Sequence, residues 1–192
     1  MARASAAVAA QTARTLLRVA TESFASEGYA AVSLEDVARS AGVTRGAVYH
    51  HYRSKAGLFG AVAAALQADV AAAVVAAAER AGAEPGAQLR AGSHAFLDAI
   101  TAAPVGQILL IDAPAVMGWA QWRALDAEHS GAHLREVLHS VGVAPELLDA
   151  TAAQLSGAMN EAALWLAQHP GDDPARAAAG RVLDRLLEAA TP

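Results

Sequence analysis

Apolar residues between positions 33 and 59 recur with the spacing of short helices that are separated by a tight turn. Within 34–41, the first, fourth, fifth and eighth positions are apolar, which places them on one face of a helix. Ser33 and Asp36 have the spacing of a capping box at the start of that helix. Gly42 follows directly and suits the left-handed conformation that ends many helices. The pattern therefore predicts a short helix followed by a turn.

The residues after this turn predict a second short helix and the start of a third. Thr44 and Ser54 are both suited to cap helices. Between them, Tyr52 can face a core, where its hydroxyl would need a partner. The outward-facing side chains are cationic or aromatic: Arg45, Tyr49, His50 and His51. A helix, a glycine-containing turn and such a second helix form the layout that places a short helix in the major groove of DNA.

At these residues the chain resembles the tetracycline-repressor (TetR) family of bacterial transcriptional regulators. The family's pattern is Thr, any residue, Gly, two residues and Tyr, followed by an aromatic residue and a Lys. It is matched here by Thr44, Gly46, Tyr49, Tyr52 and Lys55. The similarity runs from Leu16 to Phe59, and beyond it only the helical layout is family-like. The resemblance implies an N-terminal DNA-binding domain and a C-terminal domain that binds a ligand and dimerises.

Apolar periodicity predicts helices along the rest of the chain as well. They are expected at about 10–27, 54–80, 87–102, 106–111, 116–141, 146–168 and 174–190, after a loose arm at 1–9. No stretch alternates apolar and polar residues with β-branched enrichment, so no strand is predicted. We expect an all-α chain of about nine helices. A helix-turn-helix domain would cover 1–55, and a helical ligand-binding and dimerisation domain would cover 56–192.

Composition narrows the class of protein further. Hydrophobic residues make up 55% of the 192 residues and aromatic residues only 5%, so the core must consist mainly of Ala, Leu and Val. The absence of cysteine excludes disulfides, thiolate zinc sites and thiol nucleophiles. The longest unbroken apolar run, 70–78, is far shorter than the roughly 18 residues that indicate a membrane span. We expect a cytoplasmic protein with no membrane segment.

Charge is divided unevenly along the chain. Residues 1–55 hold seven Lys and Arg against four Asp and Glu, whereas 56–192 hold seven against fifteen. The formal charges are therefore +3 and −8, which together give the net charge of −5. Positive charge gathers where phosphates would lie, as expected of a DNA-binding domain, although a chance imbalance of solvated charges is the alternative.

Several side chains of the helix-turn-helix are candidates for DNA contact. Arg45 can donate two hydrogen bonds to one guanine, and Gly46 allows close approach of the backbone. The resemblance implies DNA-facing positions for Tyr49 and the two histidines after it, and Lys55 adds charge at a helix start. Each also has a plainer interpretation as a cap, a packed ring or a solvated charge. The predicted DNA-binding residues are Ser33, Thr44, Arg45, Gly46, Tyr49, His50, His51 and Lys55.

The resemblance and the apolar spacing also suggest roles for the C-terminal part. The last two helices would form a two-fold four-helix bundle between subunits, through Leu155, Met159, Ala162, Val182 and Leu186. The middle helices would enclose a ligand pocket, lined by Phe96, Ile100, Met117, Trp119, Trp122, Asn160 and Trp165. Packing within one subunit is the alternative for both sets. His129 and His133 have a spacing that two metal-binding imidazoles can use, but such pairs are common on helices, so no metal site and no cofactor are predicted.

No phosphate-binding loop, nucleophile elbow or His-Glu metal helix occurs in the sequence, so an enzyme is not expected. The sequence predicts a DNA-binding transcriptional regulator, a repressor that binds a palindromic double-stranded DNA operator as a homodimer and is released by a small-molecule effector. Two alternatives stay open. One is a DNA-binding regulator without a ligand, and the other is an all-helical small-molecule-binding protein or enzyme.

Overall fold

The structure is a computed structural model that describes the backbone of residues 2–192 and the side chains from residue 9 onward. In chain order its helices are α1 (Ala2–Ala31), α2 (Leu34–Ser40), α3 (Arg45–Tyr52), α4 (Lys55–Arg80), α5 (Pro85–Thr101), η1 (Gln107–Asp112), α6 (Ala113–Met117), α7 (Trp119–Asp126), η2 (Ala127–Gly131), α8 (Ala132–Val141), α9 (Leu148–Ala167) and α10 (Asp173–Ala190), where η marks a π-helix. No strand occurs among the described residues, and the predicted all-α fold is confirmed.

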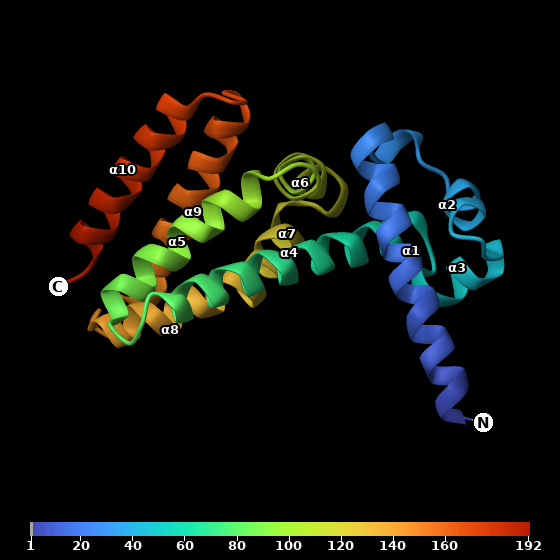
Figure 1. The fold of residues 1–192 in the computed structure, drawn as a ribbon, viewed down its shortest axis with the longest axis horizontal. Helices are drawn as coiled ribbons and strands as arrows, with labels where there is room; N and C mark the ends of the chain where they lie inside the picture. The colour runs from blue at the N-terminus through green and yellow to red at the C-terminus, as the bar shows by residue number, and fades with distance from the viewer. Residues whose placement is uncertain (1) are drawn as a thin grey trace.

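Helices α1, α2 and α3 form a small unit at one end of the molecule (Figure 1). Its core includes an aromatic cluster in which the Phe59 ring lies 5.1 Å from both Phe24 and Tyr29, edge to face. Because Phe59 belongs to α4, the start of α4 is part of this unit. The sequence predicted a loose arm over residues 1–9. That prediction is wrong, because helix α1 begins at Ala2. That segment is rich in alanine, the best helix former, and Met1 lies outside the described residues.

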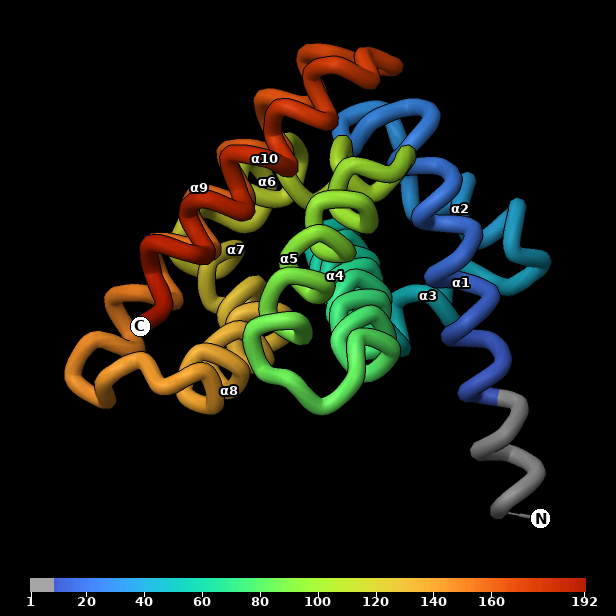
Figure 2. The backbone as a smooth tube through the Cα atoms, turned by 60° about the vertical axis from the view of Figure 1, so that its left-hand side comes forward, coloured from blue at the N-terminus to red at the C-terminus, as the bar shows by residue number. Residues whose placement is uncertain are grey.

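Helix α4 runs from the three-helix unit into the C-terminal helices (Figure 1). It lies beside α5 in the middle of the molecule, as Figure 2 shows. By length and composition alone, α4 is apolar enough to cross a membrane, a test that buried helices of soluble proteins also pass. Here α4 contacts α1, α5 and η2, and its buried residues include Gln67. Its buried apolar residues, such as Leu58, Phe59 and Val70, form the packed side of the helix.

The predicted helix over 116–141 is interrupted in the structure. Gly118 has φ 85° and ψ 152°, so the chain turns between α6 and α7. Such a φ is open to glycine and is disfavoured for residues with a Cβ. The π-helix η2 then replaces regular α-helix between α7 and α8, and it ends at Gly131. These two changes aim Asp126 and Ser130 into the body of the C-terminal part, where both are buried.

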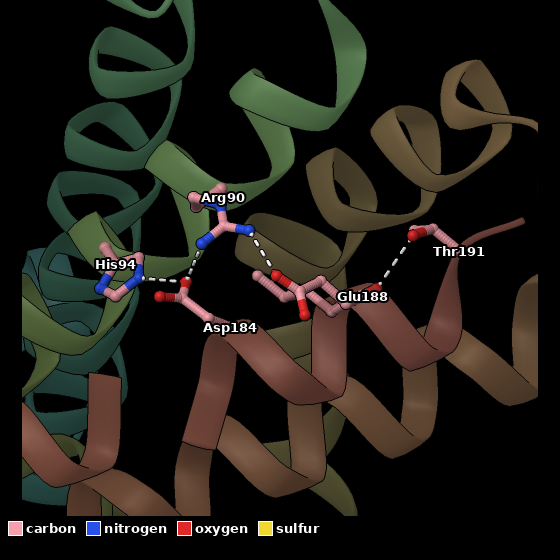
Figure 3. Close-up of polar contacts among 6 residues, drawn as sticks. Arg90, His94, Asp184, Glu188 and Thr191 are labelled. Carbon is pink, nitrogen blue, oxygen red and sulfur yellow. Dashed lines mark hydrogen bonds and ion pairs between the residues drawn. The ribbon is translucent and has the colours of Figure 1, made fainter. Parts of the chain in front are cut away.

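Helix α10 is fastened to α5 by a row of polar contacts (Figure 3). The Arg90 guanidinium pairs with Asp184 (2.9 Å) and Glu188 (3.1 Å), and His94 Nε2 lies 2.8 Å from Asp184 Oδ1. The hydrogen bond and the charge of His94, followed by the charge of Arg90, lower the pKa of Asp184 below its usual value. A further ion pair, Arg176 with Asp98 at 2.7 Å, extends the row along the two helices. One face of α10 is thereby committed to its own subunit.

Candidate nucleic-acid interface and core cavity

Local hydrogen bonds define where each helix of the helix-turn-helix begins. Ser33 Oγ accepts from the backbone N–H of Asp36 (3.1 Å) and donates to its carboxylate (2.6 Å), so the predicted N-cap is present. The capping box is only half formed, because the Asp36 carboxylate accepts from the Ser33 hydroxyl and not from the backbone N–H of Ser33. That hydroxyl and, more weakly, Arg39 lower the pKa of Asp36. Thr44 Oγ1 and Ser54 Oγ cap the two following helices, at 3.2 and 3.0 Å from the backbone nitrogens they accept from. The three predicted caps are present, and both Ser33 and Thr44 have their side chains engaged in capping.

Helix α3 is anchored by two residues and leaves its other side chains outside. Val48 is fully buried, and the Tyr52 hydroxyl donates to the carbonyl oxygen of Ala13 on α1 (3.2 Å). Burial raises the pKa of Tyr52, so this hydroxyl keeps its proton and remains a donor. The opposite side of α3 carries Arg45, Tyr49 and His50, all of which are exposed. This is the face that the sequence assigned to DNA.

Arg45 is held in place by a neighbouring helix and by its own. Its Nη1 lies 2.7 Å from the Glu35 carboxylate of α2, and its Nη2 lies 3.4 Å from the Tyr49 hydroxyl. The guanidinium also lies 5.2 Å from the centre of the Tyr49 ring. The hydrogen bond with Tyr49 and the charge of Glu35 raise the pKa of Arg45, so the side chain stays cationic. Sequence reasoning missed Glu35, because the pair joins two helices whose relative orientation no local pattern encodes.

Two more α3 positions bear on DNA contact. A Cβ placed on Gly46 would meet only Thr44 Oγ1 at 3.8 Å, an ordinary contact, so packing within the protein does not demand glycine there. A reason for glycine at this position would come from outside the protein, such as the wall of a DNA groove.

His50 is exposed and His51 is half-buried, with ring centres 5.6 Å apart. His51 also lies 5.9 Å from the Tyr52 ring, so it belongs partly to the packed side of α3.

Lys55 makes contacts within the protein. Its Nζ donates to the carbonyl oxygens of Ala30 (3.1 Å) and Val32 (2.9 Å) and lies 4.5 Å from the centre of the Tyr29 ring. The side chain therefore ties the start of α4 to the segment between α1 and α2. The sequence suggested only a surface charge near phosphate, because nothing local reveals that the two carbonyls lie within reach.

The C-terminal helices form a cavity of about 230 Å³ that opens to solvent beside the exposed residues Glu79 and Glu136. Its lining comes from α4, α5, α7, η2, α8 and α9, and includes Leu89, Phe96, Asp126, Ser130 and Met159. Among the described residues, no three His, Cys, Asp or Glu side chains are grouped so that they could hold a metal ion. About half of the lining residues are polar or charged, and the others provide an apolar wall on which a small organic molecule could pack.

The residues predicted to line a ligand pocket are dispersed. Phe96 lines the cavity. Ile100 and Trp122 are buried in the core, where the Trp122 indole donates to the carbonyl oxygen of Leu109 (2.7 Å). Asn160 is buried behind the cavity wall, 3.4 Å from Asp126 Oδ2. The remaining three lie apart from the cavity lining, with Trp119 67% exposed, Trp165 40% exposed and Met117 partly buried.

The residues predicted for dimerisation also divide into two groups. Leu155 and Met159 are each only 5% exposed and pack inside the subunit, so they offer no surface to a partner. Ala162 is half-buried, whereas Val182 and Leu186 are 55% and 41% exposed. The outer surface of α9 is formed instead by residues such as Trp165. The apolar face shared by α9 and α10 is thus shifted around α9 from the predicted position.

Comparison with known proteins identifies both parts of the chain. Residues 16–62 match the family described as "Bacterial regulatory proteins, tetR family", and residues 86–190 match "Tetracyclin repressor-like, C-terminal domain". The HTH-type transcriptional regulator SrpR of Pseudomonas putida is 43% identical over 67 residues, which are 35% of this chain and 32% of SrpR. The HTH-type transcriptional regulator AcrR of Shigella flexneri is 42% identical over 59 residues, or 31% and 27% of the two chains. The chain thus matches only about a third of the length of these curated relatives.

Solved structures extend the likeness to the whole chain. A TetR-family transcriptional regulator from Pectobacterium atrosepticum is 31% identical and superposes with a TM-score of 0.75 over 96% of both chains. The fatty acid degradation regulator FadR from Bacillus halodurans, 13% identical, shares the fold with a TM-score of 0.72 over 91% of this chain and 97% of its own. The chain therefore belongs to the TetR family of DNA-binding transcriptional regulators.

Proposed function

We propose that this protein is a cytoplasmic repressor that binds a palindromic operator as a homodimer and is released by a small molecule. The observation that carries the proposal is the outer face of α3, where Arg45, Tyr49 and His50 are exposed together above a buried Val48. A guanidinium at the N-terminal turn of a recognition helix is well placed to bind guanine. On binding DNA, the Arg45 guanidinium would leave its ion pair with Glu35 and donate hydrogen bonds to the edge of a base.

Dimerisation is supported by the apolar face that α9 and α10 leave uncovered. Val182, Leu186 and Trp165 are large apolar residues that remain 40% to 55% exposed on these two helices. Because the other side of α10 is tied to α5 by ion pairs, this face is free to meet a second copy. Two copies would present two recognition helices to half-sites about 34–36 Å apart, or a multiple of that distance.

Release by a small molecule is supported by the cavity and by its contact with α4. Val74 and Ala78 of α4 line the cavity, while the other end of the same helix holds the three-helix unit through Lys55. A ligand that prefers one position of α4 would change the separation of the two recognition helices. Its effect on DNA affinity is limited by its differential affinity for the two states, and DNA must change ligand affinity by the same factor.

The DNA-binding proposal is tested by footprinting the wild-type protein on the DNA that flanks its own gene, with and without candidate small molecules. We expect a two-fold-symmetric protected site that is lost when the effector is added. Protection that no small molecule changes would favour a regulator without a ligand. Absence of any protected site on the flanking DNA would contradict the choice of operator.

The dimer is tested separately by sedimentation or light scattering. Val182→Glu should produce monomers, because it places a charge in the centre of the proposed interface. Ala177→Glu is the matched control, since Ala177 is exposed on the same helix but on another side, and it should leave the dimer intact. A monomeric wild-type protein, or equal behaviour of the two variants, would contradict this interface.

A further inference from the structure

Acidic side chains predominate among the titratable groups that line the cavity. They are the carboxylates of Glu79, Asp126 and Glu136, whereas His133 is the one imidazole in the lining, which contains no Lys or Arg from the described part of the chain. The facing walls are apolar and include Phe96 and Val137. An anionic ligand would be repelled by this lining, whereas a cation with an apolar body would be attracted.

The buried carboxylate of Asp126 retains capacity to accept further hydrogen bonds. Asp126 is 2% exposed, and its Oδ2 accepts from Arg123 (2.8 Å), Ser156 (3.0 Å) and Asn160 (3.4 Å). Within the described residues, no side chain or backbone group donates to Oδ1. Since an ionised carboxylate can accept about four hydrogen bonds, this oxygen is available to a donor in the cavity.

The hydroxyl of Ser130 is an unused polar group at the same wall. Ser130 lines the cavity and is 9% exposed, and its buried Oγ has no hydrogen-bond partner among the described residues. A helical serine commonly bonds to the carbonyl four residues earlier, but Ser130 lies in the π-helix η2, a distortion frequent at functional sites. A buried polar group without a partner is costly, and a ligand that donates a hydrogen bond would remove that cost.

We propose that the cavity binds an organic amine in its protonated form. The ammonium group would donate a hydrogen bond to Asp126 Oδ1, and a second one to Ser130 Oγ once that side chain rotates toward the cavity. The apolar body would lie against Phe96, Val137 and Met159. This specifies the effector class of the regulator proposed above, and it rests on that proposal for its biological role. The preference for an amine is a property of the cavity and can be measured without DNA.

The test compares three compounds that share a 4-phenylbutyl body: 4-phenylbutylamine, 4-phenyl-1-butanol and 5-phenylpentanoate. Titration calorimetry of each into the full chain should show the amine binding about tenfold more tightly than the alcohol, the factor for one charge-assisted hydrogen bond. The carboxylate should bind most weakly. Equal affinities, a preference for the carboxylate, or no binding of any compound would overturn the proposal.

Two serine variants give the test residue-level control. Ser130→Ala should fold as the wild type does, because its hydroxyl has no bond to lose, and should weaken amine binding roughly two- to tenfold. Ser140→Ala removes a hydroxyl that also lines the cavity but already donates to the carbonyl oxygen of Glu136 (3.0 Å), and it should bind the amine as the wild type does. Equal amine affinities in all three proteins would refute the assignment.

DNA binding is measured on the same samples as an independent readout. If the wild-type protein does not bind operator DNA even without a ligand, the regulator proposal is contradicted and the amine preference is left intact. Conversely, normal operator binding together with equal affinities for the three compounds would overturn the amine proposal alone. Tight amine binding that leaves operator affinity unchanged would support the ligand class and contradict release by it.

Discussion

Replacing Lys55 with methionine separates two roles for this side chain. As a surface cation it would attract DNA phosphates, whereas in the structure its ammonium donates to the carbonyl oxygens of Ala30 and Val32 and lies against Tyr29. Methionine keeps an apolar stem of similar length and removes the charge and the donors. The variant should therefore lose stability if the internal tie matters, and lose only DNA affinity if it does not.

The expected loss of stability follows from the burial of each contact. The bond to Val32 is partly buried, and a hydrogen bond to a charged group is worth about 1.5–3 kcal/mol. The bond to Ala30 is exposed and adds little, and the cation–π contact with Tyr29 contributes about 0.5–1 kcal/mol. We expect a total of about 2 kcal/mol, at the lower end of this range because Lys55 is only half-buried. For a chain of this size that lowers the melting temperature by about 4–8 °C.

The assay is thermal unfolding followed by circular dichroism, with hydrogen exchange of peptides that cover 29–37 to locate the change. Arg53→Met is the matched control, because it removes one positive charge two residues away. Arg53 is exposed and makes no side-chain hydrogen bond or ion pair with any described residue. Its free energy of unfolding should change by less than about 0.5 kcal/mol. If Lys55→Met melts like the wild type and both variants flatten the salt dependence of DNA binding equally, the internal tie is refuted.

Other perturbations have equally definite outcomes. Gly57→Ala should destabilise the protein by about 1–3 kcal/mol, because the added methyl would overlap a backbone carbonyl of the preceding turn. Gly60→Ala on the same helix has open space and should stabilise by up to about 1 kcal/mol, both changes being measured by urea unfolding. Arg45→Ala should lose about 1–3 kcal/mol of discrimination between operator and scrambled DNA in a competition assay, and unchanged discrimination would exclude base reading. Because His94 lowers the folded-state pKa of Asp184, their contact stabilises the fold above the unfolded pKa of about 4 and is lost as pH falls through the lower folded value. The stability difference between wild type and Asp184→Asn should therefore shrink as urea midpoints are followed from neutral pH to below about pH 4.

The helix-turn-helix could be predicted from sequence because its determinants are local. A cap such as Ser33 or Thr44 acts on a backbone nitrogen three residues away, so its spacing is written in the chain. The core position of Tyr52 was predictable for the same reason, and the structure supplies the partner that its hydroxyl needed. Contacts between helices were not predictable. The Arg45–Glu35 pair and the carbonyls around Lys55 depend on how separate helices meet.

The side of α9 that faces the core was harder to predict from the sequence, and the composition of the helix explains why. Alanine, leucine and methionine occur on several sides of this helix, so more than one apolar face satisfies helical spacing. Packing against α5 and α8 selects the face with Leu155 and Met159 as the inner one. The outer face that remains carries polar side chains such as Gln154 and Glu161 beside the exposed Trp165. On an alanine-rich helix, exposed large apolar residues are therefore a better guide to a candidate interface than apolar periodicity is.

Helix α4 contacts both halves of the molecule. The two ends of α4 have different tasks, with Lys55 tied to the three-helix unit and Ala78 at the cavity. About 35 Å of helix separates them at 1.5 Å per residue, and no proline interrupts it. The two glycines of α4, Gly57 and Gly60, both lie in its first two turns, so the part that crosses the C-terminal core contains none. A displacement at the cavity would then reach the three-helix unit with little lost to bending, and α4 would act as a lever rather than as a flexible linker.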